Sequence, residues 1–194
     1  MHKGRLEAFS DGVIAIIITI MVLELRAPHE PTPDALRPLV PVFLSYILSF
    51  VFVGIYWNNH HHLLQATRRV NGRILWANLH LLFWLSLIPV VTGWLGESDF
   101  APWPVALYGA VMLLAGVAYF VLSRELVHHH GKDSELAAAV GMDRKGQISL
   151  ALYAMAIAIS FASPRVACGL YVLVAVMWLV PDRRIEQVLS GRQS

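Results

Sequence analysis

Charged and polar side chains stand at both ends of the first apolar segment of the chain. Arg5, Ser10 and Asp11 lie at its start, and Glu24 lies at its end. An acidic side chain at the centre of a bilayer costs about 2.5 to 3.5 kcal/mol on insertion scales, and such residues usually face protein or water. If this segment crosses a membrane, Asp11 does not face lipid. Two interpretations stay open: Asp11 has a functional role, or it caps the helix and complements the helix dipole.

The same segment carries an apolar stripe. At about 100° per residue in a helix, Ile16, Ile20 and Leu23 share one face and Thr19 lies beside them. If several copies of this helix surrounded an axis, the stripe would form rings of branched side chains, and such rings gate water and ions by dewetting. Thr19 would add a ring of hydroxyl oxygens. The alternative is an ordinary apolar face, with the Thr19 hydroxyl bonded to its own helix backbone.

The composition excludes several classes of protein. Of the 194 residues, 57% are hydrophobic and 14% are charged, whereas soluble domains carry about 25% charged residues. A soluble globular domain and a disordered chain are both excluded on this ground, and a formal net charge of +2 argues against a nucleic-acid partner. The single cysteine, Cys168, supplies neither a disulfide nor a cysteine-based zinc site within one chain. An all-α integral membrane protein in a lipid bilayer remains.

Six segments are apolar enough to cross the roughly 30 Å hydrocarbon layer as helices. The last two are short, and Ser163-Pro164-Arg165 between them is a helix-breaking sequence. This sequence predicts a tight hairpin of two spans rather than one long kinked helix. Nothing indicates a second domain, so we expect one six-helix domain over residues 1–194. The predicted spans are 8–25, 39–57, 74–96, 101–122, 148–163 and 166–181.

The distribution of basic residues predicts the orientation, because Lys and Arg accumulate on the cytoplasmic side of a membrane. With six spans, the side that holds both termini carries most of them, and the other side carries only Arg26, Arg37 and Arg165. Both termini are therefore expected in the cytoplasm. The first span lacks a cleavage site and carries Asp11, so we expect it to stay in the mature protein. The basic residues of the terminal side are Lys3, Arg5, Arg68, Arg69, Arg73, Arg124, Lys132, Arg144, Lys145, Arg183, Arg184 and Arg192.

Two stretches of the sequence resemble a known family. Residues 5–11 read R-L-E-A-F-S-D and fit the R-x-x-x-F-S-D signature that begins the first helix of the transmembrane protein 175 family, which comprises lysosomal potassium channels and bacterial relatives. The similarity continues through residues 12–16 and in residues 80–89, H-L-L-F-W-L-S-L-I-P. Six spans, cytoplasmic termini and this chain length are typical of a bacterial member, so the resemblance covers essentially the whole chain.

The resemblance implies a homotetrameric potassium-selective channel in the bacterial cell (inner) membrane, with the four first helices lining the pore. It places the narrowest hydrophobic constriction at Ile16, further hydrophobic layers at Ile20 and Leu23, and a threonine ring implicated in ion selectivity at Thr19. No T-V-G-Y-G filter is implied. We expect moderate selectivity for K+ over Na+, partly because K+ is stripped of its hydration water more readily. K+ is the implied permeant ion, and no cofactor is expected.

The signature residues are expected to anchor the first helix. Asp11 lies about 140° around the helix from Ile16, so the constriction and the signature face different directions. Phe9, Ser10 and Asp11 are therefore expected to hold the helix in place rather than to touch the ion. The candidate partners of Asp11 in the third span are Asn78, His80 and Trp84.

Two histidine runs, 60–62 and 128–130, fall on the expected cytoplasmic side. Histidine clusters bind zinc or sense pH. Adjacent residues of a helix point in different directions, however, which favours solvated side chains and no metal site. His80 lies inside a span, where it makes a hydrogen bond within the bundle or takes part in a proton relay.

Two other functions stay open. A proton-coupled secondary transporter would use Asp11 and His80 as titrating groups, and it predicts broken helices and inverted repeats that are not visible in the sequence. Proton conduction through the same pore is the other, since the resemblance extends to animal channels that also pass protons. An enzyme is not expected, because no span carries a nucleophile with its base or a convincing set of metal ligands.

Overall fold

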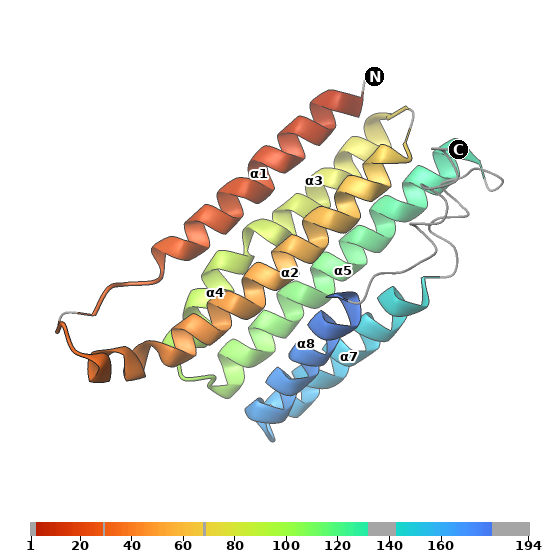
Figure 1. Cartoon of the computed structure of the whole chain (residues 1–194). Coiled ribbons are helices and arrows are strands. Elements are labelled where there is room, and N and C mark those ends of the chain that lie inside the picture. The colour runs from red at the N-terminus through yellow and green to blue at the C-terminus, as the bar shows by residue number, and fades with distance from the viewer. Residues whose placement is uncertain (1–2, 29, 68, 132–142, 180–194) are drawn as a thin grey trace, which may run out of the picture.

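The computed structural model describes residues 3–28, 30–67, 69–131 and 143–179, and all regular secondary structure in these ranges is helical. The helices run side by side as an elongated bundle, with α1 (Lys3–Leu23) along one edge and the pair of α7 (Arg144–Ser160) and α8 (Pro164–Leu179) along the opposite edge (Figure 1). The predicted all-α class is confirmed. Some basic residues that carry the orientation prediction lie outside the described residues: Arg68, Lys132, Arg183, Arg184 and Arg192.

Each predicted span corresponds to a described helix or pair of helices. Four stretches are long and apolar enough to cross a membrane, namely α1, η1 with α2, α3 with α4, and α5, and α8 is a shorter apolar helix. Positions 180 and 181 of the sixth predicted span lie outside the described residues. The helices are α1 (Lys3–Leu23), the 3-10 helix η1 (Pro33–Leu39), α2 (Val40–Gln65), α3 (Gly72–Ser86), α4 (Ile88–Glu97), α5 (Pro102–His130), α7 (Arg144–Ser160) and α8 (Pro164–Leu179).

The third predicted span, 74–96, is confirmed as one apolar stretch, and the structure adds a break within it. α3 ends at Ser86 and α4 begins at Ile88, with Leu87 between them in a turn that keeps near-helical backbone angles, φ −85° and ψ −13°. Pro89 explains the break, because proline has no N–H to donate and its ring crowds the preceding turn of a helix. The Leu87 N–H instead bonds to the carbonyl oxygen of Trp84 at 3.2 Å, which tightens the last turn of α3.

The predicted hairpin between the last two spans is confirmed. α7 ends at Ser160 and α8 begins at Pro164, and the two helices pack against each other. Proline suits the first turn of a helix, because the N–H that it lacks would have no partner there. The loop between them therefore ends one helix and starts the next within three residues, 161–163.

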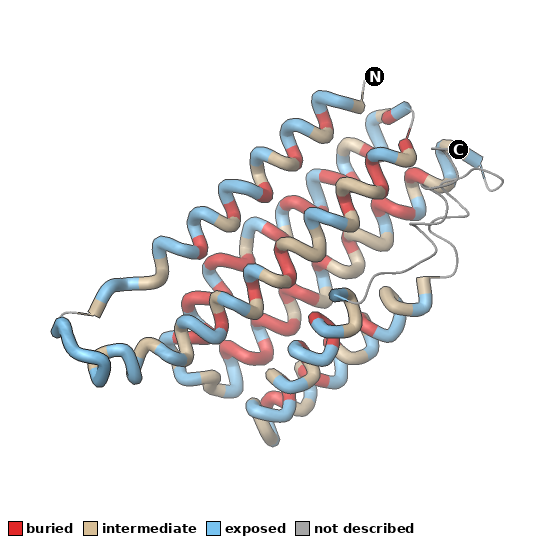
Figure 2. The backbone as a smooth tube through the Cα atoms, in the orientation of Figure 1, coloured by how far each residue is buried: buried red, intermediate tan, exposed pale blue. Residues whose placement is uncertain are grey.

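The buried residues lie where the helices face one another, and exposed residues cover the outside of the bundle (Figure 2). α2 and α4 approach so closely that a Cβ added at Gly96 would lie 2.5 Å from the Cα of Val42. Three polar groups inside this core pair with one another, because the buried hydroxyls of Thr92, Ser49 and Tyr108 form a hydrogen-bonded series with O–O distances of 2.6 and 3.1 Å. These contacts hold the broken third span against α2 and α5.

Candidate pore-lining helix

α1 packs against the rest of the chain through one face only. Its buried residues recur every three or four positions, so they occupy one side of the helix. This side contacts α2, α3 and α4. The buried residues of α1 are Leu6, Ser10, Ile14, Ile17 and Met21.

The face of α1 that points away from the bundle is apolar and uncovered. The exposed fraction is 57% for Ile16, 43% for Ile20 and 75% for Leu23, and Thr19 is exposed beside them. The structure thus places all four residues of the predicted stripe on one free surface of the chain. In a membrane, such a surface contacts either lipid or the same helix of other copies around a shared axis.

Thr19 makes the backbone hydrogen bond that one of its two interpretations predicted. Its Oγ1 donates a 2.9 Å hydrogen bond to the carbonyl oxygen of Ile16, one turn earlier in α1. This bond uses the only hydrogen of the hydroxyl, and the oxygen keeps lone pairs with which it can contact a cation. The backbone bond therefore does not remove Thr19 as an oxygen ligand.

Asp11 is held by α2. Trp57 Nε1 donates a 3.0 Å hydrogen bond to Asp11 Oδ1, and Asp11 is half-buried. The expected pairing with a residue of the third span is wrong for Asp11 and holds instead for its neighbour Ser10, which bonds to Asn78. A helix turns by about 100° per residue, so two adjacent side chains face two different helices.

A buried hydrogen-bonded chain of three side chains joins α1, α3 and α2. Ser10 Oγ donates to the carbonyl oxygen of Leu6 at 2.8 Å and accepts from Asn78 Nδ2 at 2.9 Å. Asn78 Oδ1 lies 2.7 Å from His60 Nε2, so His60 is the donor of that bond. Ser10, Asn78 and His60 are at most 1% exposed. This hydrogen-bonded series of side chains fixes the rotation of α1 about its own axis.

His60 is the residue of this chain that sequence reasoning missed. The run 60–62 was expected to be solvated, and this expectation is wrong for His60, which is buried. The spacing of His60 could have indicated its burial, because it lies seven residues after buried Val53 and four before buried Leu64, which is the periodicity of one helix face. His61 is only partly buried, and its Nδ1 lies 3.9 Å from Glu7 Oε1 of α1.

His80 and Trp84 lie apart from the signature of α1. Trp84 Nε1 donates a 2.9 Å hydrogen bond to His80 Nε2 one turn away on α3, and His80 is exposed. His80 thus bonds within its own helix and has no contact of this kind with Asp11.

The signature residues Arg5 and Phe9 are exposed, at the same end of α1 as the buried Ser10. In the described part of the chain, no three His, Cys, Asp or Glu side chains are grouped to hold a metal ion.

The region that holds this helix matches a known family. The model of the endosomal/lysosomal potassium channel TMEM175 matches residues 5–89. A protein of Chryseobacterium sp. (strain P1-3), named a potassium channel, is 55% identical over 190 residues, which are 98% of this chain and 99% of the relative. The chain belongs to the TMEM175 family of ion channels. The resemblance seen in the sequence is thereby confirmed.

Other TMEM175 relatives carry two kinds of name. A potassium channel of Chamaesiphon minutus is 28% identical, over 90% of this chain and 92% of its own length. Mouse TMEM175, named an endosomal/lysosomal proton channel, is also 28% identical, over 84% of this chain and 36% of its own length. The Chryseobacterium and Chamaesiphon relatives are therefore matched over nearly their whole length, whereas the mouse protein is much longer than this chain.

A solved structure of the TMEM175 family has the same fold. The crystal structure of a lysosomal potassium-selective channel TMEM175 homolog from Chamaesiphon minutus superposes with a TM-score of 0.79 at 28% identity, and the match covers 92% of this chain and 96% of that one. The chain is therefore an integral membrane protein with the helical fold of TMEM175 channels. TMEM175 is a family of channels and not of enzymes, as expected from the sequence.

Proposed function

We propose that four copies of this chain assemble around a central axis and form a potassium-selective channel, with α1 of each copy lining the pore. The observation that carries the proposal is the uncovered stripe of Ile16, Ile20 and Leu23 on the side of α1 that its own bundle leaves free. Four such stripes that face one axis would form three apolar layers. Bacterial TMEM175 relatives that are named potassium channels support K+ as the permeant ion.

The apolar layers would act as the gate. A ring of Ile16 side chains offers an ion no oxygen ligands, so a closed ring is a barrier and opening must widen or rotate it. K+ loses its hydration water more readily than Na+, and the Thr19 oxygens partly compensate that loss. This arrangement predicts moderate selectivity for K+ over Na+ without a T-V-G-Y-G filter and without a cofactor.

The signature residues would position the gate from outside the pore. Asp11 bonds to Trp57 of α2, and Ser10 bonds to Asn78 of α3, so both hold α1 against its own subunit. Arg5 and Phe9 belong to the same signature at the start of α1. His80 with Trp84 would support α3, since the two side chains bond to each other.

The surrounding membrane and the orientation belong to the same proposal. The excess of Lys and Arg on the side of the termini supports a cytoplasmic location for both termini, and the bacterial relatives support a cell (inner) membrane. The whole chain, residues 1–194, would act as a single channel domain in a lipid bilayer.

Cysteine accessibility tests the pore-lining role. Cys168 is the single cysteine, so a Cys168→Ser background makes each introduced thiol unique. We expect a charged methanethiosulfonate reagent to block the K+ current of Ile16→Cys and Leu23→Cys, because these side chains would line the water-filled path. The matched control is Leu173→Cys, an exposed leucine of α8 on the other edge of the bundle. Equal sensitivity of all three variants would contradict the proposal.

Proton conduction is the second candidate, and the name of the mouse relative favours it. The same uncovered stripe would then line a proton path. A proton-coupled transporter has less support, because Asp11 and His80, its expected titrating pair, have separate partners on α2 and α3. Ion-substitution experiments separate K+ from H+ as the permeant ion.

A further inference from the structure

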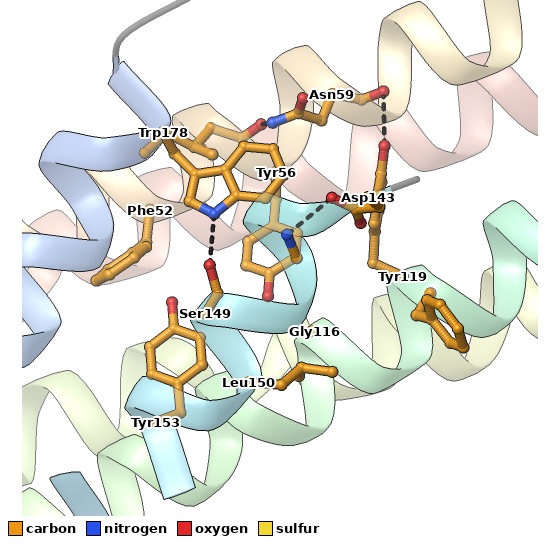
Figure 3. Close-up of a pocket in the computed structure, with 13 residues that line it drawn as sticks. Phe52, Tyr56, Asn59, Gly116, Tyr119, Asp143, Ser149, Leu150, Tyr153 and Trp178 are labelled. Atoms are coloured by element: carbon orange, nitrogen blue, oxygen red, sulfur yellow. Dashed lines mark hydrogen bonds between the residues drawn. The ribbon is translucent and has the colours of Figure 1, made fainter. Parts of the chain in front are cut away.

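A small cavity lies on the far side of the molecule from the free face of α1. It encloses about 50 Å³ between α2, α5, α7 and α8. Aromatic side chains of all four helices line it, and one carboxylate stands among them (Figure 3). The lining residues that carry the argument are Tyr56, Tyr119, Tyr153, Trp178, Asp143 and Gly116.

Three of the four aromatic hydrogen-bond donors named above are already used by the protein, and the Tyr153 hydroxyl is the one without such a bond among the described residues. Tyr119 Oη donates to the carbonyl oxygen of Asn59 at 3.4 Å, and Tyr56 Oη lies 3.5 Å from the carbonyl oxygen of Met112. Trp178 Nε1 donates to Ser149 Oγ at 2.8 Å (Figure 3). The aromatic residues therefore have ring surface to offer a ligand, and little capacity to donate to an anion.

Asp143 supplies negative charge at the cavity. Its Oδ1 accepts a 2.7 Å hydrogen bond from the Gly146 N–H and so caps α7. Among the described residues no group donates to Oδ2, which leaves this oxygen for a cation. Asp143 is also the only charged residue in the described lining, so no described lysine or arginine of the lining neutralises it.

The combination of π faces, one carboxylate and few free donors fits a positively charged organic group. Ammonium groups are attracted to aromatic faces, and a carboxylate forms charge-assisted hydrogen bonds with N–H donors. A water molecule needs about 10–15 Å³ of such space, so a cavity of about 50 Å³ has room for a group the size of ethanolammonium.

Gly116 of α5 provides part of this space. A Cβ added there would lie 2.9 Å from Leu150 Cδ2 and 3.7 Å from Tyr56 Oη. The cavity also lies near the ends of two membrane helices, because Asp143 precedes α7 and Trp178 is next to the last residue of α8. Lipid headgroups sit at this level of a membrane, where Trp and Tyr are enriched.

We propose that this cavity is a binding site for a small primary ammonium group, carried by a free amine or by an ethanolamine lipid headgroup. The ammonium group sits against the rings of Tyr56, Tyr119 and Trp178 and donates to Asp143. This site is separate from the ion path, since none of the four stripe residues of α1 lines it.

The test uses the purified full chain in detergent and follows tryptophan fluorescence during titration with ethanolammonium chloride. Ethylene glycol, which has the same number of non-hydrogen atoms and no charge, is the matched control ligand, and KCl keeps the ionic strength constant. We expect a saturable change with ethanolammonium only, and its loss in Trp178→Phe. An equal response to ethylene glycol would overturn the proposal.

Two variants assign the binding to this cavity. Asp143→Asn keeps an oxygen that can cap α7 but removes the charge, and we expect binding to weaken by about tenfold, as for the loss of one charge-assisted contact. Gly116→Ala narrows the cavity without touching Asp143 and should weaken binding independently. The control is Asp34→Asn on the exposed η1. Unchanged affinity in Gly116→Ala, or in an Asp143→Asn protein with a normal thermal transition, would overturn the proposal.

Nanodiscs identify the source of the ammonium group. If the lipid headgroup is the occupant, ethanolammonium binds less tightly in nanodiscs that contain phosphatidylethanolamine than in pure phosphatidylglycerol. If the free amine is the occupant, the two affinities are equal. If ethanolammonium gives no saturable response in either kind of nanodisc, the proposal of a binding site in the membrane-embedded protein is overturned.

Discussion

The buried chain of Ser10, Asn78 and His60 decides how α1 is turned. Each of these side chains comes from a different helix, and each is almost fully buried. A buried polar group without a partner costs about 1 to 3 kcal/mol, so the three residues stabilise one rotation of α1 over the others. That rotation presents Ile16 on the uncovered face.

Asn78→Ala is predicted to destabilise the protein. It leaves His60 Nε2 and the Ser10 hydroxyl lone pair without partners in the core, and we expect the free energy of unfolding to fall by about 1 to 3 kcal/mol. Thermal unfolding in detergent, followed by circular dichroism, measures the effect. Asn58→Ala is the matched control, because Asn58 is exposed. Identical unfolding temperatures of the two variants would show that the buried chain contributes nothing.

Ile16→Ala is predicted to raise the single-channel conductance severalfold and to lower the preference for K+. The smaller side chain widens the narrowest proposed ring and weakens dewetting. Single-channel recording in symmetric KCl checks the conductance. Val172→Ala on the exposed surface of α8 is the control and should leave it unchanged. A lower conductance in Ile16→Ala would place the constriction elsewhere.

At the residue scale, the sequence predicted the stripe better than the partners of the signature. The stripe follows from helical periodicity alone, and the structure places Ile16, Ile20 and Leu23 on a single exposed face. The partner of Asp11 depended on how α2 lies beside α1, and no local pattern carries that information. His60 was missed because its two neighbours are histidines of a different environment, so the run concealed the periodicity of one member.

At the scale of elements, α1 is a helix docked by one side. Its buried face contacts α2, α3 and α4, and its other face is left to lipid or to other copies. The elements under it approach closely at Gly96, where α4 meets the backbone of α2. The break at Leu87 lets α4 make this approach in a direction of its own.

Gly96→Ala is predicted to destabilise the fold by about 1 to 3 kcal/mol, the usual cost of overpacking. The added Cβ would lie 2.5 Å from the Cα of Val42 and 3.1 Å from its backbone nitrogen, which cannot move without shifting α2. Thermal unfolding again measures the change. Gly169→Ala in α8 is the matched control, since nothing lies within 4 Å of its added Cβ, and alanine gains up to about 1 kcal/mol in a helix. Equal loss in both variants would refute the close packing.

The number of membrane spans was predictable from the sequence, whereas breaks within a span were less predictable. Hydropathy is summed over about 20 residues of a span, so the signal was strong for the first four spans and weaker for the two short ones that became α7 and α8. The interruption of the third span depends on the single residue Pro89, and prolines are tolerated within membrane helices. The sequence alone therefore did not distinguish a bent helix from two helices.

At the scale of the whole molecule, the free face of α1 is the feature that one chain leaves incomplete. The stripe has no partner in its own bundle among the described helices, and four copies around an axis would complete it. Family membership was predictable from the signature in residues 5–11, because that motif is specific. The number of copies in the assembly was not predictable from the residues, because no pattern within one chain encodes a symmetry axis.

The reversal potential of the purified protein in a planar bilayer tests the central claim most directly. With K+ on one side and Na+ on the other at equal pH, we expect the reversal potential to shift toward the K+ equilibrium potential, because the proposed pore favours the ion that dehydrates more easily. A pH gradient imposed in the same experiment should move it little. Absence of current, or a reversal potential that follows the proton gradient, would contradict a potassium-selective channel.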